Sequence, residues 1–464
     1  MLAELEEALG DDILRMADEQ IAKSLVTEKT VRQQGNQMQE IDLDALKFMQ
    51  GPRLMANKKC ILPKGSTRLT KHGYEEVYVP AVRQATSEVK LVPISAMPQW
   101  ARAAFPAYMT HLNRIQSTLY KQAFTTPDNL LVCAPTGAGK TNIAMLACLQ
   151  ILDEMRTERG FNLKKFKIIY IAPMKALVSE VVGNFQARLE SFGIKVKELT
   201  GDVHLTKQQI EETNVIVTTP EKWDIITRKS GDRAYVELVR LIIIDEVHLL
   251  HDSRGPVLES IIARTIRQVE ETQELVRIVG LSATLPNYQD VAALLRVDPK
   301  SGLFFFDSTH RPVPLEQVFI GITEKKAIKR VMVMNEVCYE KVIERVDRHQ
   351  IIVFTHSRKE TARSAKIMRD MALAQDKLGL LCKEGSESKK ILLDIVVEKK
   401  QVVSSDLQDL LPFGIGIHHA GLTKEDRSLV EDLFAAGHLK VLVSTATLAW
   451  GVNLPAHTVI IKGT

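Results

Sequence analysis

A glycine-rich loop between an apolar run and a helical stretch is the first feature of the sequence with a definite chemistry. The apolar residues 131–133 lead into Ala-Pro-Thr-Gly-Ala-Gly-Lys-Thr at residues 134–141. Glycines let backbone N–H groups wrap around phosphates, and the N-terminus of the following helix adds the positive end of its dipole. Lys140 is expected to reach the β- and γ-phosphates of a nucleotide, and the Thr141 hydroxyl to bind Mg²⁺. The predicted nucleotide-binding loop consists of Ala134, Pro135, Thr136, Gly137, Ala138, Gly139, Lys140 and Thr141.

Two adjacent carboxylates follow another apolar run. Leu241–Ile244 leads into Asp245 and Glu246, and open α/β sheets bind their ligands at the carboxyl ends of their strands. Phosphoryl transfer needs a metal holder and a residue that positions the attacking water. We expect Asp245 to hold Mg²⁺ through its water shell and Glu246 to orient and deprotonate the water; a helix N-cap is the alternative role for Asp245. Together with Lys140, these two residues form the predicted catalytic set.

Small hydroxyl side chains follow a third run, Val276–Leu281, at Ser282 and Thr284. We expect both, with His248, to link the nucleotide to a second binding surface; a plain turn is the alternative. Gln116 precedes the glycine-rich loop by eighteen residues. We expect its amide to hydrogen-bond the edge of an adenine, and the alternative is an ordinary surface glutamine.

The residues that could do chemistry are set among apolar runs that alternate with helical stretches. Short β-rich runs separated by helices are typical of βαβ units with a buried parallel sheet. The alternation restarts after Thr323, so we predict two α/β bodies, at about residues 100–320 and 321–464. The predicted strands are Leu130–Ala134, Lys167–Ala172, Val215–Thr218, Leu241–Ile244, Ile278–Leu281 and Phe304–Phe306 in the first body, and Ile351–Phe354, Gly414–Ile417, Val441–Val443 and Val459–Ile461 in the second.

The first hundred residues differ from these two bodies. Residues 1–50 carry eleven Asp and Glu against five Lys and Arg, whereas residues 51–75 carry six Lys and Arg against Glu75 alone. Glycine and proline interrupt residues 51–99. We predict an acidic helical arm over residues 1–50 and an extended strap or linker over residues 51–99, whose basic segment is a solvated linker or a contact for a polyanion. The apolar face of the arm is defined by Leu2, Leu5, Leu9, Ile13 and Met16.

Composition bounds the class of protein. The 464 residues are 45% hydrophobic and 25% charged, which fits a folded globular protein and excludes a globally disordered or fibrous one. The five cysteines form no close pair and no zinc-binding spacing, which fits a reducing compartment. No apolar stretch reaches the length of a membrane span, so we expect no membrane partner. A net charge of +4 is too small, at this length, to indicate nucleic-acid binding by itself.

These motifs occur in the order and at the intervals of superfamily-two helicases, and the sequence resembles the Ski-type DExH branch of that superfamily. The resemblance covers nearly the whole chain from about residue 50. Ala134 stands where the general phosphate-binding pattern has its first glycine. The segments that carry the resemblance are Asn113–Ser117, Ala134–Thr141, Ala172–Lys175, Thr200–Asp202, Thr219–Asp224, Asp245–His248, Ser282–Thr284, Phe354–Lys359, His418–Gly421 and Ser444–Pro455.

Two further segments, Trp223–Lys229 and His251–Pro256, resemble the N-terminal cassette of the large spliceosomal helicases. Leu62–Ser66 and Gly73–Val77 resemble the segment that leads into that cassette. The resemblance implies two tandem RecA-like domains, ATP and Mg²⁺ as cofactors, and an RNA duplex with a single-stranded overhang as substrate. It also implies the unwinding of small nuclear RNAs in pre-mRNA splicing, spliceosomal protein partners and a location in the nucleus.

The resemblance further implies where RNA binds. RNA would cross the top of both bodies, held mainly through its phosphates and therefore without regard to its sequence. The resemblance, not the residues, supplies a 3′→5′ direction of movement. The implied contacts are Lys175, Gly201 and Thr219 in the first body, and His356, Ser357, Thr445 and Thr447 in the second.

Two other interpretations remain open. One is a sister helicase of the activating signal cointegrator type, which acts on stalled ribosomes or damaged DNA. The other is a non-catalytic helicase-like scaffold, against which Lys140, Asp245 and Glu246 argue. The last motif of the family, with a glutamine and two arginines, would lie beyond Thr464. We therefore expect the second body to be incomplete and ATP hydrolysis by these residues alone to be slow.

Overall fold

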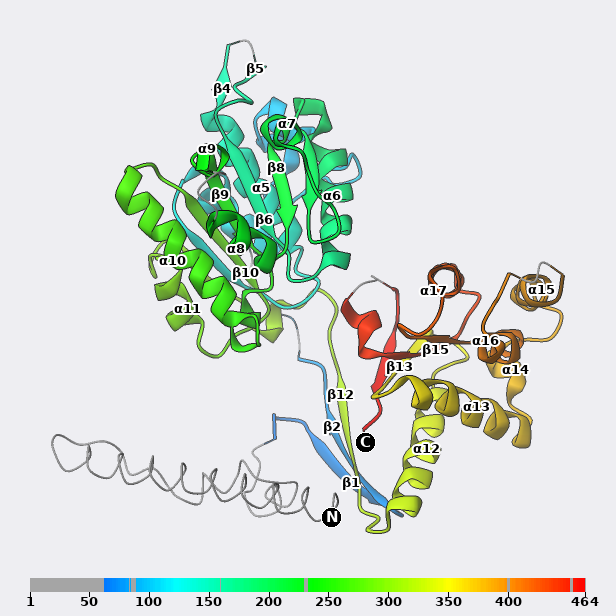
Figure 1. The fold of residues 1–464 in the computed structure, drawn as a ribbon. Coiled ribbons are helices and arrows are strands. Elements are labelled where there is room, and N and C mark those ends of the chain that lie inside the picture. The colour runs from blue at the N-terminus through cyan, green and yellow to red at the C-terminus, as the bar shows by residue number, and fades with distance from the viewer. Residues whose placement is uncertain are drawn as a thin grey trace, which may run out of the picture. The chain divides into compact units, whose positions relative to one another are not determined.

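The computed structural model describes residues 62–82, 84, 89–158, 160–228, 233–398, 401–450 and 454–463. The predicted helical arm, the first part of the predicted strap and Cys60 lie outside the described residues. Residues 1–64 and 65–464 form two units, and all the labelled elements of Figure 1 belong to the second.

Seven strands form the sheet of the first α/β body: β3 (Leu130–Cys133), β6 (Lys167–Ile171), β7 (Val196–Leu199), β8 (Val215–Thr218), β9 (Val239–Ile244), β10 (Arg277–Ser282) and β11 (Leu303–Phe305). They pair in the order β11-β3-β10-β9-β6-β8-β7, and every pair is parallel (Figure 1). Six of these strands were predicted from their apolar runs. Strand β7 was missed because its sequence, Val-Lys-Glu-Leu, has apolar residues only at its ends.

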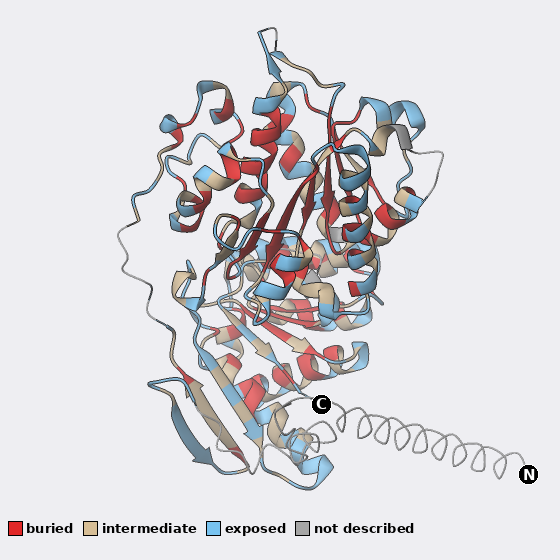
Figure 2. Ribbon diagram, turned by 90° about the vertical axis from the view of Figure 1, so that its left-hand side faces the viewer, coloured by how far each residue is buried: buried red, intermediate tan, exposed pale blue. Residues whose placement is uncertain are grey.

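Helices cover both faces of this sheet, and Figure 2 shows its strands as buried. Along the inner strands, side chains alternate between two apolar clusters: Val132 and Tyr170 belong to one, Leu131 and Ile169 to the other. Because neither face of these inner strands meets water, both sets of side chains must be apolar, and the inner strands appear in the sequence as continuous apolar runs. The first cluster includes α4 (Arg114–Thr125), α5 (Lys140–Glu154) and α6 (Lys175–Leu189), and the second includes α8 (Pro220–Arg228), α10 (Gly255–Thr272) and α11 (Tyr288–Leu294).

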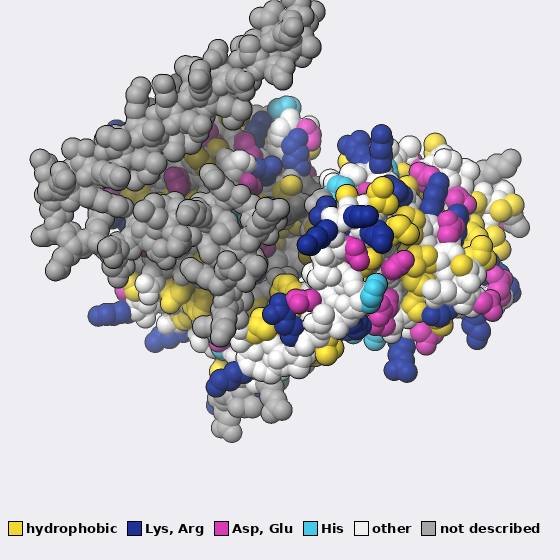
Figure 3. Space-filling view, turned by 90° about the horizontal axis from the view of Figure 1, so that it is seen from below, with side chains coloured by type: hydrophobic (Ala, Val, Ile, Leu, Met, Phe, Trp, Pro, Cys, Tyr) yellow, Lys and Arg dark blue, Asp and Glu magenta, His cyan; other side chains and the backbone are white. Residues whose placement is uncertain are grey.

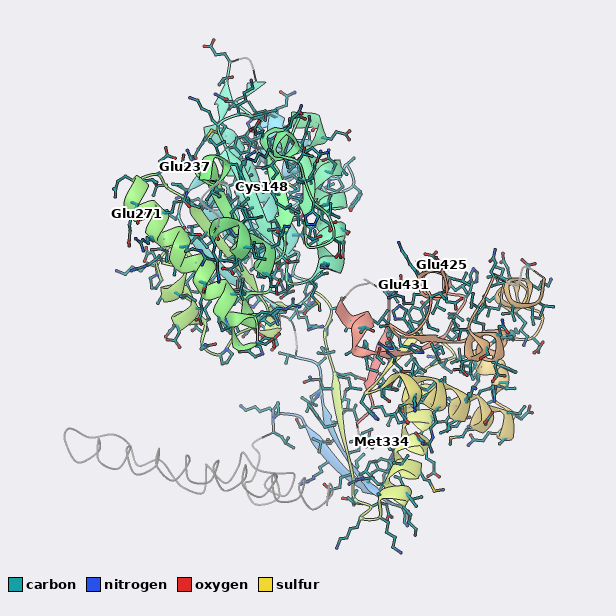
Figure 4. The ribbon with its side chains drawn as sticks, in the orientation of Figure 1. Cys148, Glu237, Glu271, Met334, Glu425 and Glu431 are labelled. Atoms are coloured by element: carbon teal, nitrogen blue, oxygen red, sulfur yellow. The ribbon has the colours of Figure 1, made fainter. Side chains whose placement is uncertain are left out.

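Helix α5 lies deep in the first of these clusters. Ten consecutive residues, Ile143–Leu152, are buried, and Figure 4 shows Cys148 of this helix in the middle of the body. A helix that is buried on all sides is held by packing around its whole circumference. The start of α5, which carries Lys140 and Thr141, is therefore fixed relative to the sheet.

Four strands form the sheet of the second body: β13 (Ile351–Thr355), β14 (Ile415–His418), β15 (Val441–Thr445) and β16 (Thr458–Ile461). Their order is β14-β15-β13-β16, and all pairs are parallel. One apolar cluster joins this sheet to α12 (Ala327–Ile343), α13 (Arg358–Ala374), α16 (Ser405–Leu410) and α17 (Lys424–Ala435). Two parallel sheets, each packed against helices, confirm the predicted α/β class.

A separate three-stranded antiparallel ribbon consists of β1 (Thr67–Lys71), β2 (Tyr74–Val79) and β12 (Gln317–Ile322). The segment predicted as an extended strap therefore contains a hairpin, and β12, at the predicted boundary of the two bodies, pairs with it. Ion pairs tie the ribbon to α12: Lys341 lies 3.2 Å from Glu76, and Lys71 lies 3.5 Å from Glu340. Figure 3 shows, on the face seen from below, Lys and Arg side chains placed among Asp and Glu side chains.

The remaining elements are short. Among the described residues, no helix is long and apolar enough to cross a membrane, and the four described cysteines are buried and unpaired. The short elements include α3 (Gln99–Arg102), β4 (Arg156–Thr157), β5 (Gly160–Phe161), α7 (Lys207–Glu212), α9 (Arg233–Val236), α14 (Leu378–Leu381), α15 (Glu387–Leu393) and the 3₁₀ turns η6 (Val247–His251) and η10 (Ala446–Trp450).

Candidate functional site

The strand order of the first sheet gathers three predicted loops at one edge. The glycine-rich loop follows β3, Ser282 ends β10, and Asp245 follows β9. Since β10 lies between β3 and β9, Ser282 stands between the other two sites. The Ala134 N–H donates to the Ser282 carbonyl at 3.0 Å, and the buried Ser282 hydroxyl has no hydrogen-bond partner within the described part of the chain.

The glycine-rich loop has the backbone that a phosphate cradle needs. Gly137 and Gly139 have φ angles of 82° and 77°, in the left-handed region that glycine adopts without strain. Among the described residues, no side chain caps the first turn of α5, so the N–H groups of Lys140 and Thr141 keep the capacity to bind an anion, while the Asn142 N–H donates to the Gly139 carbonyl at 3.0 Å. Lys140 begins this helix, and its Nζ donates to the Ala134 carbonyl across the loop at 3.4 Å.

Helix α4 supports this loop from behind, and Gln116 is part of the support. Gln116 is only 2% exposed, so its interpretation as a surface glutamine is wrong. Its Oε1 accepts from the Asn113 N–H at 3.1 Å, and its Nε2 donates to the Gly139 carbonyl at 3.2 Å. Asn113 caps α4 and also donates to the Ala138 carbonyl at 2.8 Å. The adenine contact of Gln116 stays a prediction, because both ends of its amide are bonded within the protein.

A cavity of about 340 Å³ opens beside the loop. Its lining includes Asn113, Arg114, Gly137, His310 and Arg311. The sequence reasoning missed His310 and Arg311, since the segment after β11 carries no motif. Because Gly137 of the loop belongs to its lining, this cavity offers space beside the loop in which a nucleotide base could lie.

Asp245 is held by two donors. Its Oδ1 accepts from the Glu246 N–H at 2.9 Å, and its Oδ2 accepts from the Tyr170 hydroxyl at 2.7 Å. Burial raises the pKa of Asp245 to about 6, and the charge of Glu246 adds to the rise. The alternative role as a helix cap is not what the structure contains, since Glu246 holds the N-cap position of η6 and makes no capping bond.

The backbone of Glu246 is strained, and neighbouring groups stabilise the ionised form of its carboxylate. Its φ of 50° is unusual for a residue with a side chain. Burial alone would raise the pKa of Glu246, but His248 and Lys140 outweigh it and hold this pKa below its ordinary value. The Glu246 Oε2 lies 3.1 Å from the His248 Nδ1 and makes no hydrogen bond within the described residues. A carboxylate kept ionised beside the loop can accept a proton from water.

His248 also approaches the loop after β10. The Ala283 N–H donates to the His248 Nδ1 at 3.4 Å, so one ring nitrogen faces both Glu246 and the segment that follows Ser282. This contact fits the predicted coupling role of His248. Thr284 is exposed at the end of the same segment.

The predicted RNA-binding residues of the first body lie after the next three strands of the sheet. Lys175 follows β6, Thr219 follows β8 and Gly201 follows β7, and the three strands are neighbours. The Lys175 Nζ lies 2.7 Å from an oxygen of Asp202, an exposed ion pair that the sequence reasoning missed. Thr219 is buried, with its carbonyl accepting from the Trp223 N–H at 3.1 Å.

An arginine that connects two of these loops was also not predicted from the sequence. Arg254 donates to the Pro173 carbonyl and lies 3.3 Å from Glu221. It therefore ties the loop before Lys175 to the helix after Thr219. Its only signal in the sequence is the resemblance of residues 251–256.

The predicted contacts of the second body also gather at one edge. His356 and Ser357 follow β13, and Thr445 ends β15, the neighbouring strand. The Ser357 Oγ accepts from the Glu360 N–H at 3.3 Å and so caps α13. The Thr445 and Thr447 hydroxyls lie 2.9 Å apart. These side chains offer hydroxyl groups and an exposed imidazole side by side.

Comparison with known families covers both bodies. The model of the DEAD/DEAH box helicase family matches residues 113–291, and that of the helicase conserved C-terminal domain matches residues 376–463. Together the two matches span more than half of the chain. They include the glycine-rich loop and the Asp245–Glu246 pair of the first body, and β14, β15 and β16 of the second body, whereas β13 precedes the second match.

Curated relatives align along most of the chain. The U5 small nuclear ribonucleoprotein 200 kDa helicase of Homo sapiens is 59% identical over 92% of this chain and 20% of its own length. The DExH-box ATP-dependent RNA helicase DExH12 of Arabidopsis thaliana is 58% identical over 92% of this chain and 20% of its own length. The pre-mRNA-splicing factor brr2 of Schizosaccharomyces pombe is 57% identical over 96% of this chain and 20% of its own length. The chain spans about a fifth of the length of these relatives.

A solved structure shares the fold. The crystal structure of the DUF1998 helicase MrfA bound to DNA matches with a TM-score of 0.57 and 18% identity, over 84% of this chain and 47% of that chain. The matched family models, the spacing of the site residues along two parallel sheets and the identity to these relatives lead to one conclusion: the chain belongs to the DEAD/DEAH box helicases.

Proposed function

We propose that the chain is an ATP-dependent RNA helicase that couples ATP hydrolysis to translocation along RNA and to the unwinding of RNA duplexes. The observation that carries the proposal is the meeting of the Lys140 loop with the Asp245–Glu246 pair, one strand apart at the same sheet edge. An intact lysine, metal holder and base are the parts that phosphoryl transfer requires. They favour an enzyme over a non-catalytic scaffold.

The residues of the site divide the work of hydrolysis. The N–H groups of the loop and Lys140 bind the phosphates and neutralise their charge. Glu246 takes a proton from water while the water oxygen bonds to the γ-phosphorus and the bond from phosphorus to the ADP oxygen breaks. The low pKa of Glu246 keeps it ionised, and therefore able to accept that proton, at neutral pH.

The donor set fits Mg²⁺. This ion prefers oxygen ligands and keeps several of its waters, and Thr141 and Asp245 supply a hydroxyl and a carboxylate. Within the described residues, no group of three or more His, Cys, Asp or Glu could hold a metal ion by itself. We therefore infer that Mg²⁺ binds together with the nucleotide phosphates, where it supplies compensating positive charge.

RNA phosphates are the proposed ligand of the other strand ends. Lys175, now paired with Asp202, would exchange that exposed carboxylate for a phosphate at little cost, because exposed ion pairs are weak. Gly201 and Thr219 stand beside it. The second body would contribute hydroxyl and imidazole groups at His356, Ser357, Thr445 and Thr447. Such contacts would hold the RNA backbone and would not distinguish one base sequence from another.

The names of the relatives support a finer proposal. Two of them are named as a U5 small nuclear ribonucleoprotein helicase and a pre-mRNA-splicing factor. We propose that this chain acts on small nuclear RNAs in pre-mRNA splicing, together with spliceosomal proteins, in the nucleus.

Single-turnover ATP hydrolysis with and without RNA tests the enzymatic role. Lys140→Ala should weaken ATP binding at least tenfold, because a phosphate charge loses its partner. Glu246→Gln should keep ATP binding and slow hydrolysis by about 10²-fold, the scale of a lost general base. Glu237→Gln is the control and should match the wild type, because Glu237 (labelled in Figure 4) is exposed and precedes β9, whereas Asp245 follows the other end of that strand. Hydrolysis that is equal in all four proteins would refute the assignment.

A further inference from the structure

Tyr170 of β6 is a buried tyrosine whose hydroxyl reaches the catalytic edge of the sheet. It is 1% exposed, and its hydroxyl donates to the Asp245 Oδ2 at 2.7 Å. In the parallel pair of β6 and β9, Tyr170 stands opposite Ile243. Asp245 comes two residues after Ile243, so its side chain points to the same face of the sheet as Tyr170. The Asp245 N–H also donates to the Ile171 carbonyl at 3.0 Å, which fixes the Asp245 backbone.

The ring of Tyr170 is itself held in place. It packs edge-to-face on Phe185 of α6, with ring centroids 5.4 Å apart at 71°. Helix α6 begins at Lys175, a proposed RNA contact. A buried aromatic ring with a packed partner has little freedom to move its hydroxyl. The Tyr170 hydroxyl is therefore a fixed donor rather than an adjustable one.

We propose that Tyr170 is a positioning residue that fixes the Asp245 carboxylate for Mg²⁺ from behind, and that it joins this carboxylate to the helix that begins at Lys175. The inference rests on the proposed function, since it takes Asp245 as the metal holder. Within the described part of the chain, each oxygen of Asp245 has one protein donor, the Glu246 N–H for Oδ1 and the Tyr170 hydroxyl for Oδ2. Two donors on opposite oxygens set the plane of the carboxylate and leave each oxygen with further acceptor capacity.

The substitution Tyr170→Phe tests the role of the hydroxyl separately from that of the ring. It keeps the ring that packs on Phe185 and removes only the bond to Asp245. A hydrogen bond to a charged group contributes about tenfold or more to an equilibrium. We therefore expect the variant to need about tenfold more Mg²⁺ for half-maximal nucleotide binding, while its affinity for nucleotide without Mg²⁺ changes less than twofold.

Binding of a fluorescent methylanthraniloyl derivative of ADP, titrated with MgCl₂ in the full chain, measures both quantities without hydrolysis. Tyr339→Phe is the matched control: Tyr339 is also buried, and its hydroxyl donates to Gln375 in the second body at 3.3 Å. Its Mg²⁺ midpoint should equal that of the wild type. Thermal unfolding of both variants without nucleotide shows the cost of losing a buried hydroxyl alone.

The outcomes separate this inference from the function on which it rests. A Tyr170→Phe protein that melts lower but keeps the wild-type Mg²⁺ midpoint would overturn the positioning role. A wild-type chain that binds the ADP derivative equally well with and without Mg²⁺ would instead overturn the metal-holding role of Asp245. A raised midpoint in Tyr170→Phe alone, with Tyr339→Phe unchanged, supports the proposal.

Discussion

The burial of the Asp245 carboxylate lowers the stability of the folded protein. Its pKa is raised from 3.8 to about 6, chiefly by burial. A folded-state pKa above the unfolded value means that the native state binds more protons between about pH 4 and pH 6. Stability therefore falls as pH rises through this window, and the charged carboxylate costs the nucleotide-free protein about 3 kcal/mol above it.

Asp245→Asn should remove this cost. The amide can still accept from the Glu246 N–H and donate to the Tyr170 hydroxyl. Without nucleotide, the variant should melt a few degrees higher than the wild type at pH 7.5, and the difference should vanish near pH 4. Differential scanning calorimetry across this pH range measures it. A variant that melts lower than the wild type at pH 7.5 would show that the carboxylate is not destabilising.

At the scale of elements, the cap of α4 also supports the nucleotide loop. The Asn113 Oδ1 accepts from the Gln116 N–H at 2.8 Å, and its Nδ2 donates to the Ala138 carbonyl. Asn113→Ala should cost about 1–2 kcal/mol, typical of a lost cap. It should also weaken ADP binding several-fold, because the loop loses a support.

Thr206→Ala is the matched control for this prediction. Thr206 caps α7 with the same reciprocal bonds, to Gln209, and its bonds reach no part of the glycine-rich loop. Chemical unfolding should show a similar loss of stability in both variants, whereas ADP binding should weaken in Asn113→Ala alone. Equal ADP affinity in the two proteins would contradict the supporting role of α4.

At the scale of the whole molecule, the ribbon joins elements that are far apart in sequence. Strand β2 pairs with β12, and Glu76 of β2 lies between Lys341 of α12 at 3.2 Å and Lys71 at 3.4 Å. The Glu76 side chain is only 12% exposed. Removing the charge of such a buried carboxylate costs more stability than removing that of an exposed one, because solvent and salt screen its ion pairs less.

Glu76→Gln should therefore loosen the ribbon by about 1–2 kcal/mol and raise amide hydrogen exchange in residues 67–79. Glu75→Gln breaks the exposed pair with Arg68 and should change exchange much less. Hydrogen exchange followed by mass spectrometry compares the two. Equal exchange in both variants would mean that the ion pairs around Glu76 do not hold the ribbon.

The sequence alone determined the parts of this protein that depend on neighbours along the chain. A glycine-rich turn before a helix, a carboxylate pair after an apolar run and the runs themselves are local patterns, and all ten predicted strands are present. Such patterns depend on backbone conformations and on the periodicity of burial, which short segments specify. They were sufficient for the fold class and for the position of Lys140, Asp245 and Glu246.

Tertiary structure alone decided which side chains meet. The placement of β10 between β3 and β9 brings Ser282 between the loop and Asp245. The register of β6 on β9 gives Asp245 its bond to Tyr170, and the packing of α4 buries Gln116 against Gly139. Strand β7 and the pairing of the strap with β12 also escaped the sequence patterns. The reason is physical: partners across a sheet or between packed helices are set by strand order and register, which depend on contacts between residues distant in the chain.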